Sequence, residues 1–379
     1  MSLYDQLRNS QNPSADFPQM LDKLTIDNDL LLNVMLELTP VCNFSCPFCY
    51  ARVSPAELKK RNIQVMDFDG WKRYIDQFAQ MNAMLLSFTG GECTLHPDFC
   101  RLYRYAYDKG FTVSVFTNGS HITDEILEMF TQLPPYRVFL TLYGSNPETY
   151  KKVTGNADFC EIVKRNVEKM VANKIDVILQ ATLSNDNYRD VEDLYAYADK
   201  LGLEIRVTSQ LAPSGNCTDE VYQEQKVDND ALKESSLNRW KLQQGIAADQ
   251  VIPMRHIVPL PANPNAKGIK CNAGKNACFI RHDGKMLGCN LLSAYEVDTH
   301  DRPLTECFAD LNRWAKQLPR IKECEGCIHA VHCSTCVAAH YADTKQIGVP
   351  SPKLCFKVLH PEKARQERDF FEKHGYLEI

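Results

Sequence analysis

The sequence lacks a long apolar run. Its most apolar stretch, Leu30 to Leu38, is interrupted by Asn33 and Glu37 and falls far short of the ~20 apolar residues that cross a bilayer. The N-terminal residues Met1 to Pro18 are polar and lack the apolar core of a signal peptide. These two absences predict a cytoplasmic protein with no membrane partner.

The chain also lacks an excess of positive charge. It has 43 Lys and Arg against 48 Asp and Glu over 379 residues, and its formal net charge is −5. Nucleic-acid binding needs clustered cations, so we expect no nucleic-acid partner. The hydrophobic share of 44% and charged share of 24% are typical of globular proteins. At ~100–200 residues per domain, the length predicts two or three domains.

Cysteine, in contrast, is abundant and unevenly spread. Of the 16 cysteines, three lie close together at Cys42, Cys46 and Cys49. Eight more lie late in the chain: Cys271, Cys278, Cys289, Cys324, Cys327, Cys333, Cys336 and Cys355. Disulfides are rare in the cytoplasm, so these two groups predict metal ligands or catalytic thiols. The five isolated cysteines, Cys93, Cys100, Cys160, Cys217 and Cys307, are expected to be small buried hydrophobes.

Short apolar, β-branched runs alternate with helical patterns in the first 210 residues. Strands are expected at 32–39, 83–89, 112–117, 138–142, 176–183 and 204–208, and helices at 69–81, 99–109, 124–133, 159–174 and 188–201. Asp69 is the expected N-cap of the first of these helices. Strand–helix repeats predict an α/β fold with parallel strands, and six strands favour an open or partial barrel over a complete eight-stranded one.

Unusual loops follow the first four predicted strands. They contain Cys42 to Cys49, Thr89 to Glu92, Thr117 to Gly119 and Tyr143 to Ser145. The carboxyl ends of parallel strands meet on one face, where βα folds place their chemistry. The four loops therefore predict a single site.

The spacing Cys42-x3-Cys46-x2-Cys49 is the strongest motif in the first half of the chain. Iron–sulfur clusters usually take four cysteines, so three would leave one iron open for a reacting ligand. The alternative is a zinc site completed by a distant histidine. The first histidine of the chain is His96, which is not near this motif.

At these residues the sequence resembles the radical S-adenosylmethionine (radical SAM) superfamily. Cys42-Asn-Phe-Ser-Cys46-Pro-Phe-Cys49 followed by Tyr50 is similar to its cluster motif, and Gly90-Gly91-Glu92 to its cofactor-binding loop. The resemblance implies a partial (β/α)6 TIM-like barrel over residues 30–210. It also implies a [4Fe–4S] cluster on the three cysteines that, with a low-potential electron, cleaves SAM to a 5′-deoxyadenosyl radical.

The same resemblance implies contacts to SAM. Glu92 would accept from the methionyl amine, Gly90 and Gly91 would allow a close backbone approach, and the backbone near Tyr50 would meet the adenine. Further ribose or methionine contacts would come from three later strand ends: Asn118, Thr141 and Gln180.

The late cysteines form a second ordered pattern. Asp283-Gly284 predicts a hairpin turn that brings Cys271 and Cys289 near each other. A zinc ribbon made by Cys324, Cys327, Cys333 and Cys336 is one interpretation, but it leaves the other four cysteines unexplained.

The whole late pattern resembles the SPASM extension of radical SAM enzymes, a small cysteine-rich domain with a β-hairpin. It implies two auxiliary clusters, and so three [4Fe–4S] clusters in all. The first would be held by Cys271, Cys278, Cys289 and Cys336, and the second by Cys324, Cys327, Cys333 and Cys355.

Five segments follow from these assignments. They are an N-terminal extension (1–29), the barrel (30–210), a linker or lid (211–265) with a helix at 229–242, the SPASM domain (266–360) and a C-terminal helix (361–379).

The resemblance also implies a substrate class. Relatives with this extension mostly modify peptides, so we expect a ribosomal-peptide maturase that makes an oxidative modification or a crosslink. Its electron donor would be a flavodoxin or ferredoxin. Only about thirty residues precede the first strand, too few for a leader-binding domain, so we expect leader recognition to come from a separate protein or to be absent.

Three alternatives stay open. One is a radical SAM dehydrogenase of a small molecule. A sulfatase-maturase activity is disfavoured, because Asn290 stands where those enzymes carry an aspartate base. A non-catalytic iron–sulfur electron carrier or regulatory protein is disfavoured by the intact cysteine motif together with Glu92.

Overall fold

The computed structural model describes residues 13–60, 63–227, 271–319, 321–324, 327 and 336–355, together with seven single positions between 358 and 373. The helix expected at 229–242 and Cys333 lie outside the described residues. Of the expected C-terminal helix, only isolated residues are described.

The six predicted parallel strands are confirmed. They are β1 (Asn33–Thr39), β2 (Leu85–Gly90), β3 (Thr112–Thr117), β4 (Arg137–Thr141), β5 (Val177–Thr182) and β6 (Ile205–Thr208). They lie side by side in chain order, each parallel to the next. The α/β partial TIM-like barrel is therefore confirmed.

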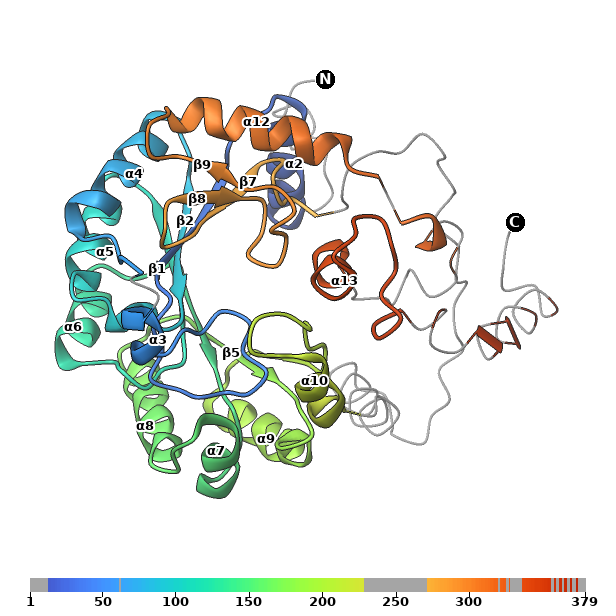
Figure 1. Cartoon of the computed structure of the whole chain (residues 1–379). Coiled ribbons are helices and arrows are strands. Elements are labelled where there is room, and N and C mark those ends of the chain that lie inside the picture. The colour runs from blue at the N-terminus through green and yellow to red at the C-terminus, as the bar shows by residue number, and fades with distance from the viewer. Residues whose placement is uncertain are drawn as a thin grey trace.

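Helices between the strands form a crescent around the outside of the sheet (Figure 1). They are α4 (Phe68–Gln80), α5 (Phe99–Asp108), α6 (Asp124–Gln132), α7 (Pro147–Thr154), α8 (Phe159–Ala172) and α9 (Val191–Leu201). Phe88 of β2 packs against Phe99 and Tyr103 of α5, with ring centroids 6.0 and 6.4 Å apart, so this face of the sheet is the outer one. No helix in the described part of the chain is long and apolar enough to cross a membrane.

The expected N-cap of α4 is wrong by two residues. Asp67 caps the helix, because its side chain accepts from the Gly70 N–H at 2.9 Å. Asp69 lies inside the first turn, where a carboxylate still interacts favourably with the helix dipole. Two acidic residues so close together offer the same capping chemistry, and only the backbone path decides between them.

The sheet continues beyond the six predicted strands. β7 (Ala277–Ile280) runs parallel to β1, pairing Ile280 with Leu36, and β8 (Lys285–Leu287) and β9 (Val297–Asp298) add antiparallel strands. The turn predicted at Asp283-Gly284 is confirmed, with Gly284 at φ 74°. The late cysteine region therefore shares one nine-stranded sheet with the barrel.

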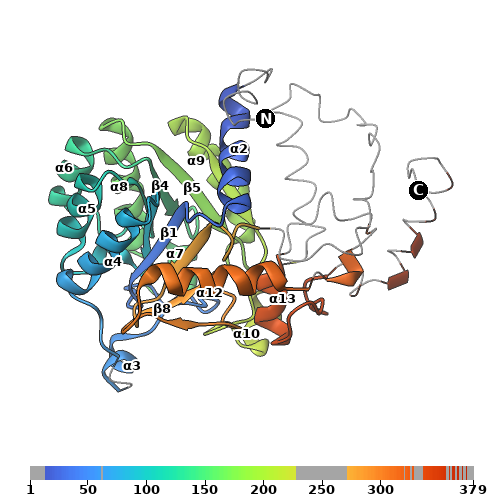
Figure 2. The same cartoon turned by 90° about the horizontal axis from the view of Figure 1, so that it is seen from above.

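The remaining helices lie around this frame. α12 (Leu304–Gln317) runs alongside the β7–β9 hairpin, and α2 (Pro13–Asp27) lies near the start of β1 (Figures 1 and 2). The shorter ones are α3 (Pro55–Lys60), α10 (Asp219–Gln225), α13 (Val337–Thr344), and the 3₁₀ turns η1 (Cys93–Leu95), η2 (Tyr188–Asp190) and η3 (Lys322–Cys324).

Candidate active site

The loop that carries the first three cysteines begins directly after β1. Its backbone turns so that the Phe44 N–H donates to Cys42 Sγ at 3.4 Å and the Arg52 N–H donates to Cys49 Sγ at 3.3 Å. The Cys49 N–H donates to the Cys46 carbonyl at 3.2 Å. N–H groups aimed at sulfur stabilise negative charge there, as a thiolate ligand requires.

The three thiols lie within electrostatic reach of one another. Burial, with smaller contributions from the charges of Glu92 and Cys49, raises the pKa of the Cys42 thiol to about 12, although hydrogen bonds from Phe44 and Asn118 oppose the rise. Burial raises the pKa of Cys46 well above its ordinary value, with further contributions from Cys49 and Cys42. Without a metal the thiols of Cys42 and Cys46 stay neutral, and the positive charge of bound iron is what would favour their thiolate forms.

This arrangement fits a cubane cluster better than a single ion. Among the described residues, no three Cys, His, Asp or Glu side chains converge closely enough to hold one metal ion. A cubane presents its irons at separate corners, each bound by one thiolate, so its ligands need not converge on one point. The set of three neighbouring thiols and inward-pointing N–H donors therefore suits an iron–sulfur cluster.

The glycine–glutamate loop after β2 packs directly on the cysteine loop. A Cβ atom on Gly90 would lie 2.4 Å from the Thr39 carbonyl oxygen, and one on Gly91 would lie 2.4 Å from the Val41 carbonyl oxygen. No side chain fits at either position. The glycines therefore allow the loops after β1 and β2 to pack closely together. From the sequence we expect them to allow a close approach of the cofactor instead.

Glu92 is the most enclosed carboxylate of the site, with 1% of its surface exposed. Its Oε1 accepts from the Thr94 N–H (3.1 Å), the Thr94 hydroxyl (2.7 Å) and the Thr117 hydroxyl (2.7 Å). Its Oε2 accepts from the Asn118 N–H at 2.6 Å. Burial raises the pKa of Glu92, and these hydrogen bonds oppose that rise. A carboxylate oxygen has two lone pairs, so Oε2 keeps capacity for another donor.

The other predicted cofactor contacts lie at neighbouring strand ends. Thr141 and Gln180 are partners in register on β4 and β5. The Tyr50 hydroxyl lies 2.7 Å from Asn290 Nδ2, which donates to it. Asn118 is buried and its side-chain amide donates to Cys42 Sγ at 3.5 Å, so it points at the cysteine loop.

The inner face of the sheet carries polar and aromatic groups that the sequence did not single out. Phe116 and Phe139 stack with ring centroids 4.5 Å apart, and the Arg206 guanidinium lies 5.7 Å from the Phe139 ring. Phe139 and Thr141 alternate with outer-face residues on β4, so they share the inner face. This surface offers stacking and cationic groups beside the predicted site.

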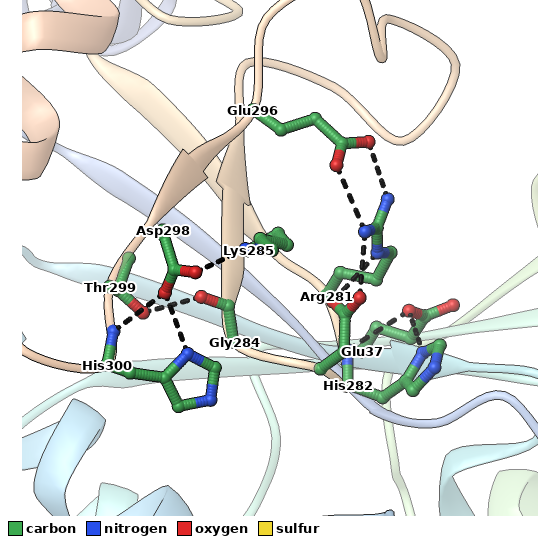
Figure 3. A network of polar contacts seen from close by, with 10 residues as sticks. Glu37, Arg281, His282, Gly284, Lys285, Glu296, Asp298, Thr299 and His300 are labelled. Atoms are coloured by element: carbon green, nitrogen blue, oxygen red, sulfur yellow. Dashed lines mark hydrogen bonds and ion pairs between the residues drawn. The ribbon is translucent and has the colours of Figure 1, made fainter. Parts of the chain in front are cut away.

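The hairpin also supplies His282 as a hydrogen-bond partner for the buried Glu37. Glu37 of β1 accepts from the His282 ring Nδ1 at 2.7 Å and from the His282 N–H at 3.2 Å (Figure 3). Glu37 is in register with Thr89, next to the outward-facing Leu36–Phe88 pair, so it projects to the inner face. In the sequence it only interrupts an apolar run, and nothing local indicates its partner.

The late cysteines are brought together only in part. The charges of Cys336 and Cys271 add to burial in raising the pKa of Cys289 to about 11, so these three thiols are neighbours. Cys278 is 3% exposed and lies in the main core on β7, in register with Val34. Burial alone raises its pKa. The structure does not bring Cys278 to the other three.

The second predicted late set is less defined. The Cys327 N–H donates to the Cys324 carbonyl at 3.4 Å, so these two residues share one turn, as a Cys-x2-Cys pair should. Cys355 lies after α13, where its N–H donates to the Ser351 carbonyl at 3.0 Å.

Comparison with known proteins identifies the domain formed by the first half of the chain. Residues 36–198 match the Radical SAM superfamily model. The chain carries a radical SAM domain. The matched segment runs from β1 into α9 and includes the cysteine loop and Glu92. A radical SAM domain implies a [4Fe–4S] cluster and SAM, and the chain is an enzyme.

Relatives extend the match over most of this radical SAM protein. It is 25% identical over 368 residues to the mycofactocin maturase MftC of Mycobacterium ulcerans, covering 93% of this chain and 95% of the relative. It is 25% identical over 326 residues to the AdoMet-dependent heme synthase of Methanosarcina barkeri, covering 81% and 91%. The structure of anSMEcpe with bound AdoMet and Cp18Cys peptide has a TM-score of 0.62 at 15% identity, covering 90% and 96%, which shows a shared fold.

Proposed function

We propose that this protein is a radical SAM enzyme that abstracts a hydrogen atom from a peptide and leaves an oxidative modification or crosslink. The observation that carries the proposal is a pair of loops: the loop with the three thiols begins at the backbone on which Gly90 and Gly91 pack, and Glu92 lies close enough to Cys42 for its charge to act on that thiol. The peptide substrate is supported by the likeness to the mycofactocin maturase over nearly the whole of both chains. The cluster and SAM together would supply a 5′-deoxyadenosyl radical when bound.

The chain's own residues have assigned roles in this proposal. Cys42, Cys46 and Cys49 would hold the cluster. Glu92 Oε2 would accept from the methionyl amine with its remaining lone pair, a charge-assisted hydrogen bond. Thr141 and Gln180, side by side in register, would contact the ribose or methionine part of SAM, and the backbone near Tyr50 the adenine.

Two auxiliary clusters are part of the proposal. Cys271, Cys289 and Cys336 would hold the first, since their thiols are neighbours. Cys278 packs in the core, so we assign it a packing role and not a ligand role. Cys324, Cys327, Cys333 and Cys355 would hold the second. A domain of the SPASM type would then join the barrel sheet through β7. A flavodoxin or ferredoxin would supply electrons to the enzyme.

The lid assigned to residues 211–265 has partial structural support. The Asn216 N–H donates to the Cys49 carbonyl at 3.1 Å, and a Cβ atom on Gly215 would lie 2.3 Å from the Tyr50 carbonyl oxygen. The first residues of this segment therefore pack on the cysteine loop. We propose that they shield the site from water.

The test is anaerobic incubation of the reduced protein with SAM, followed by assay of 5′-deoxyadenosine. Wild-type protein should form it, Cys46→Ala should not, and Cys100→Ala, at a half-buried cysteine outside both groups, should behave as wild type. Iron analysis should give about twelve irons per chain for three cubanes. About four irons with zinc would contradict the auxiliary assignment, and absence of 5′-deoxyadenosine with the clusters intact would contradict the enzyme.

A small-molecule substrate is the second candidate, because the match to the heme synthase covers 91% of that relative at the same identity. The two candidate substrates are distinguished by assays with synthetic copies of the peptides that are encoded beside the gene. The peptide proposal predicts a mass change in one of them that depends on SAM and on Cys46. A set of peptides that all keep their mass, while 5′-deoxyadenosine accumulates, would favour the small molecule. A peptide that changes only together with a second encoded protein would identify the separate leader-binding partner.

A further inference from the structure

Asn118, directly after β3, uses every polar atom of its side chain within the protein. Its Nδ2 donates to Asn43 Oδ1 at 3.0 Å and to Cys42 Sγ at 3.5 Å. Its Oδ1 accepts from the Ser120 N–H at 2.9 Å and from the Ser120 hydroxyl at 2.6 Å. A carboxamide has two N–H donors and two acceptor lone pairs, so no capacity remains for SAM.

The network around Asn118 is closed, with Asn118 buried at its centre and Asn43 exposed at its edge. Asn118 is 5% exposed. Its two hydrogen-bond partners also contact each other, since the Asn43 amide donates to the Ser120 hydroxyl at 2.8 Å. Its backbone N–H donates to Glu92 Oε2 at 2.6 Å. One residue therefore connects a cysteine of the cluster loop to the carboxylate assigned to SAM.

We propose that Asn118 sets the reduction potential of the cluster held by Cys42, Cys46 and Cys49 through its N–H···S hydrogen bond, and that it does not contact SAM. This inference rests on the proposed function. A donor to a ligating sulfur stabilises the more negative, reduced state, and hydrogen bonds to the sulfurs are among the factors that set cluster potentials. Asn118 is thus a positioning residue that acts through Cys42.

The structure supplies a matched control. Asn166 of α8 is also a buried asparagine, at 4% exposed, and its Nδ2 donates to the Gly119 carbonyl at 2.8 Å. It holds the same loop through Gly119, but it donates to a backbone carbonyl, whereas Asn118 donates to a thiol. Replacing either residue by alanine removes one amide without changing charge.

The experiment compares Asn118→Ala, Asn118→Asp and Asn166→Ala in the reconstituted full-length protein. Midpoint potentials come from EPR-monitored redox titration, and SAM affinity from equilibrium binding. Both Asn118 variants should titrate at more negative potential, with Asn118→Asp at least as far because it adds negative charge. Asn166→Ala should keep the wild-type potential. SAM affinity of Asn118→Ala should stay within about threefold of wild type.

Several results would overturn the inference. One is an unchanged potential in Asn118→Ala, above all with SAM binding weakened about tenfold or more. Another is an equal shift in Asn166→Ala, since the loop would then act as a whole. Loss of iron from both Asn118 variants but not from Asn166→Ala would assign Asn118 to holding the cluster. Wild-type protein that binds no four-iron cluster, measured first, would overturn the proposed function itself.

Discussion

Two buried glutamates, Glu92 just after β2 and Glu37 on β1, serve different parts of the molecule. Glu92 accepts hydrogen bonds from Thr94 just after β2, from Thr117 at the end of β3 and from Asn118 just after it. Glu37, 6% exposed, accepts from His282, 245 residues away in the chain. The first carboxylate connects the loops of the proposed reaction site, and the second connects the hairpin to the barrel. Equal burial therefore does not imply equal function, and the partners decide it.

The largest expected effect that separates the two is on SAM binding. Glu92→Gln places an NH₂ donor where one oxygen now accepts, and removes the charge offered to the methionyl amine. Loss of a hydrogen bond to a charged group, worth about 1.5–3 kcal/mol, should weaken SAM binding about 10- to 100-fold and reduce 5′-deoxyadenosine formation. The matched change Glu37→Gln should leave SAM affinity near wild type in equilibrium binding. Equal losses in both variants would erase the distinction between the two glutamates.

What the sequence could predict follows the same division. The residues around Glu92 are close in sequence or lie at the end of the next strand. The spacing of the motifs is therefore enough to predict this site. The Glu37–His282 pair depends on β7 joining β1, and that parallel pairing leaves no local pattern. Cys278 shows the same limit, because its membership in the core follows from the register of β7 with β1. The capping choice between Asp67 and Asp69 depends on backbone geometry alone, which the residue types do not reveal.

The free energy of unfolding should show the reverse order, with a larger effect at Glu37 than at Glu92. Glu37→Gln removes the negative charge, and His282→Gln removes the imidazole ring, from a contact between side chains that are only 8% and 12% exposed. We expect each to lower the free energy of unfolding by about 1–3 kcal/mol, and the double variant to reveal a coupling of about 1 kcal/mol or more. Denaturant unfolding under anaerobic conditions measures the cycle. Fully additive losses would mean that the two residues stabilise the fold independently.

The pH dependence of stability gives a smaller effect that is specific to Glu92. Burial raises its pKa in the folded protein, so the folded state binds this proton more tightly than the unfolded state. The corresponding stability is present below the ordinary glutamate pKa of about 4.3 and is lost as the pH rises through the folded pKa. Glutamine does not titrate. The stability of wild type relative to Glu92→Gln, measured by denaturant unfolding at several pH values, should therefore decline with rising pH. A constant difference would contradict the raised pKa.

The smallest effect is expected at a second histidine–carboxylate pair on the same hairpin. The His300 ring Nδ1 lies 2.8 Å from Asp298 Oδ1, a geometry close to that of His282 and Glu37, but the His300 side chain is 54% exposed (Figure 3). Asp298 also keeps Lys285 as an ion-pair partner, so His300→Gln leaves no buried group without a partner. Exposed ion pairs contribute little because water screens them and competes for both groups. We expect no measurable change in the midpoint of thermal unfolding for His300→Gln, beside a clear decrease for His282→Gln. Equal decreases would show that the hairpin responds to loss of either histidine, and that enclosure by the barrel is not what gives the Glu37 pair its strength.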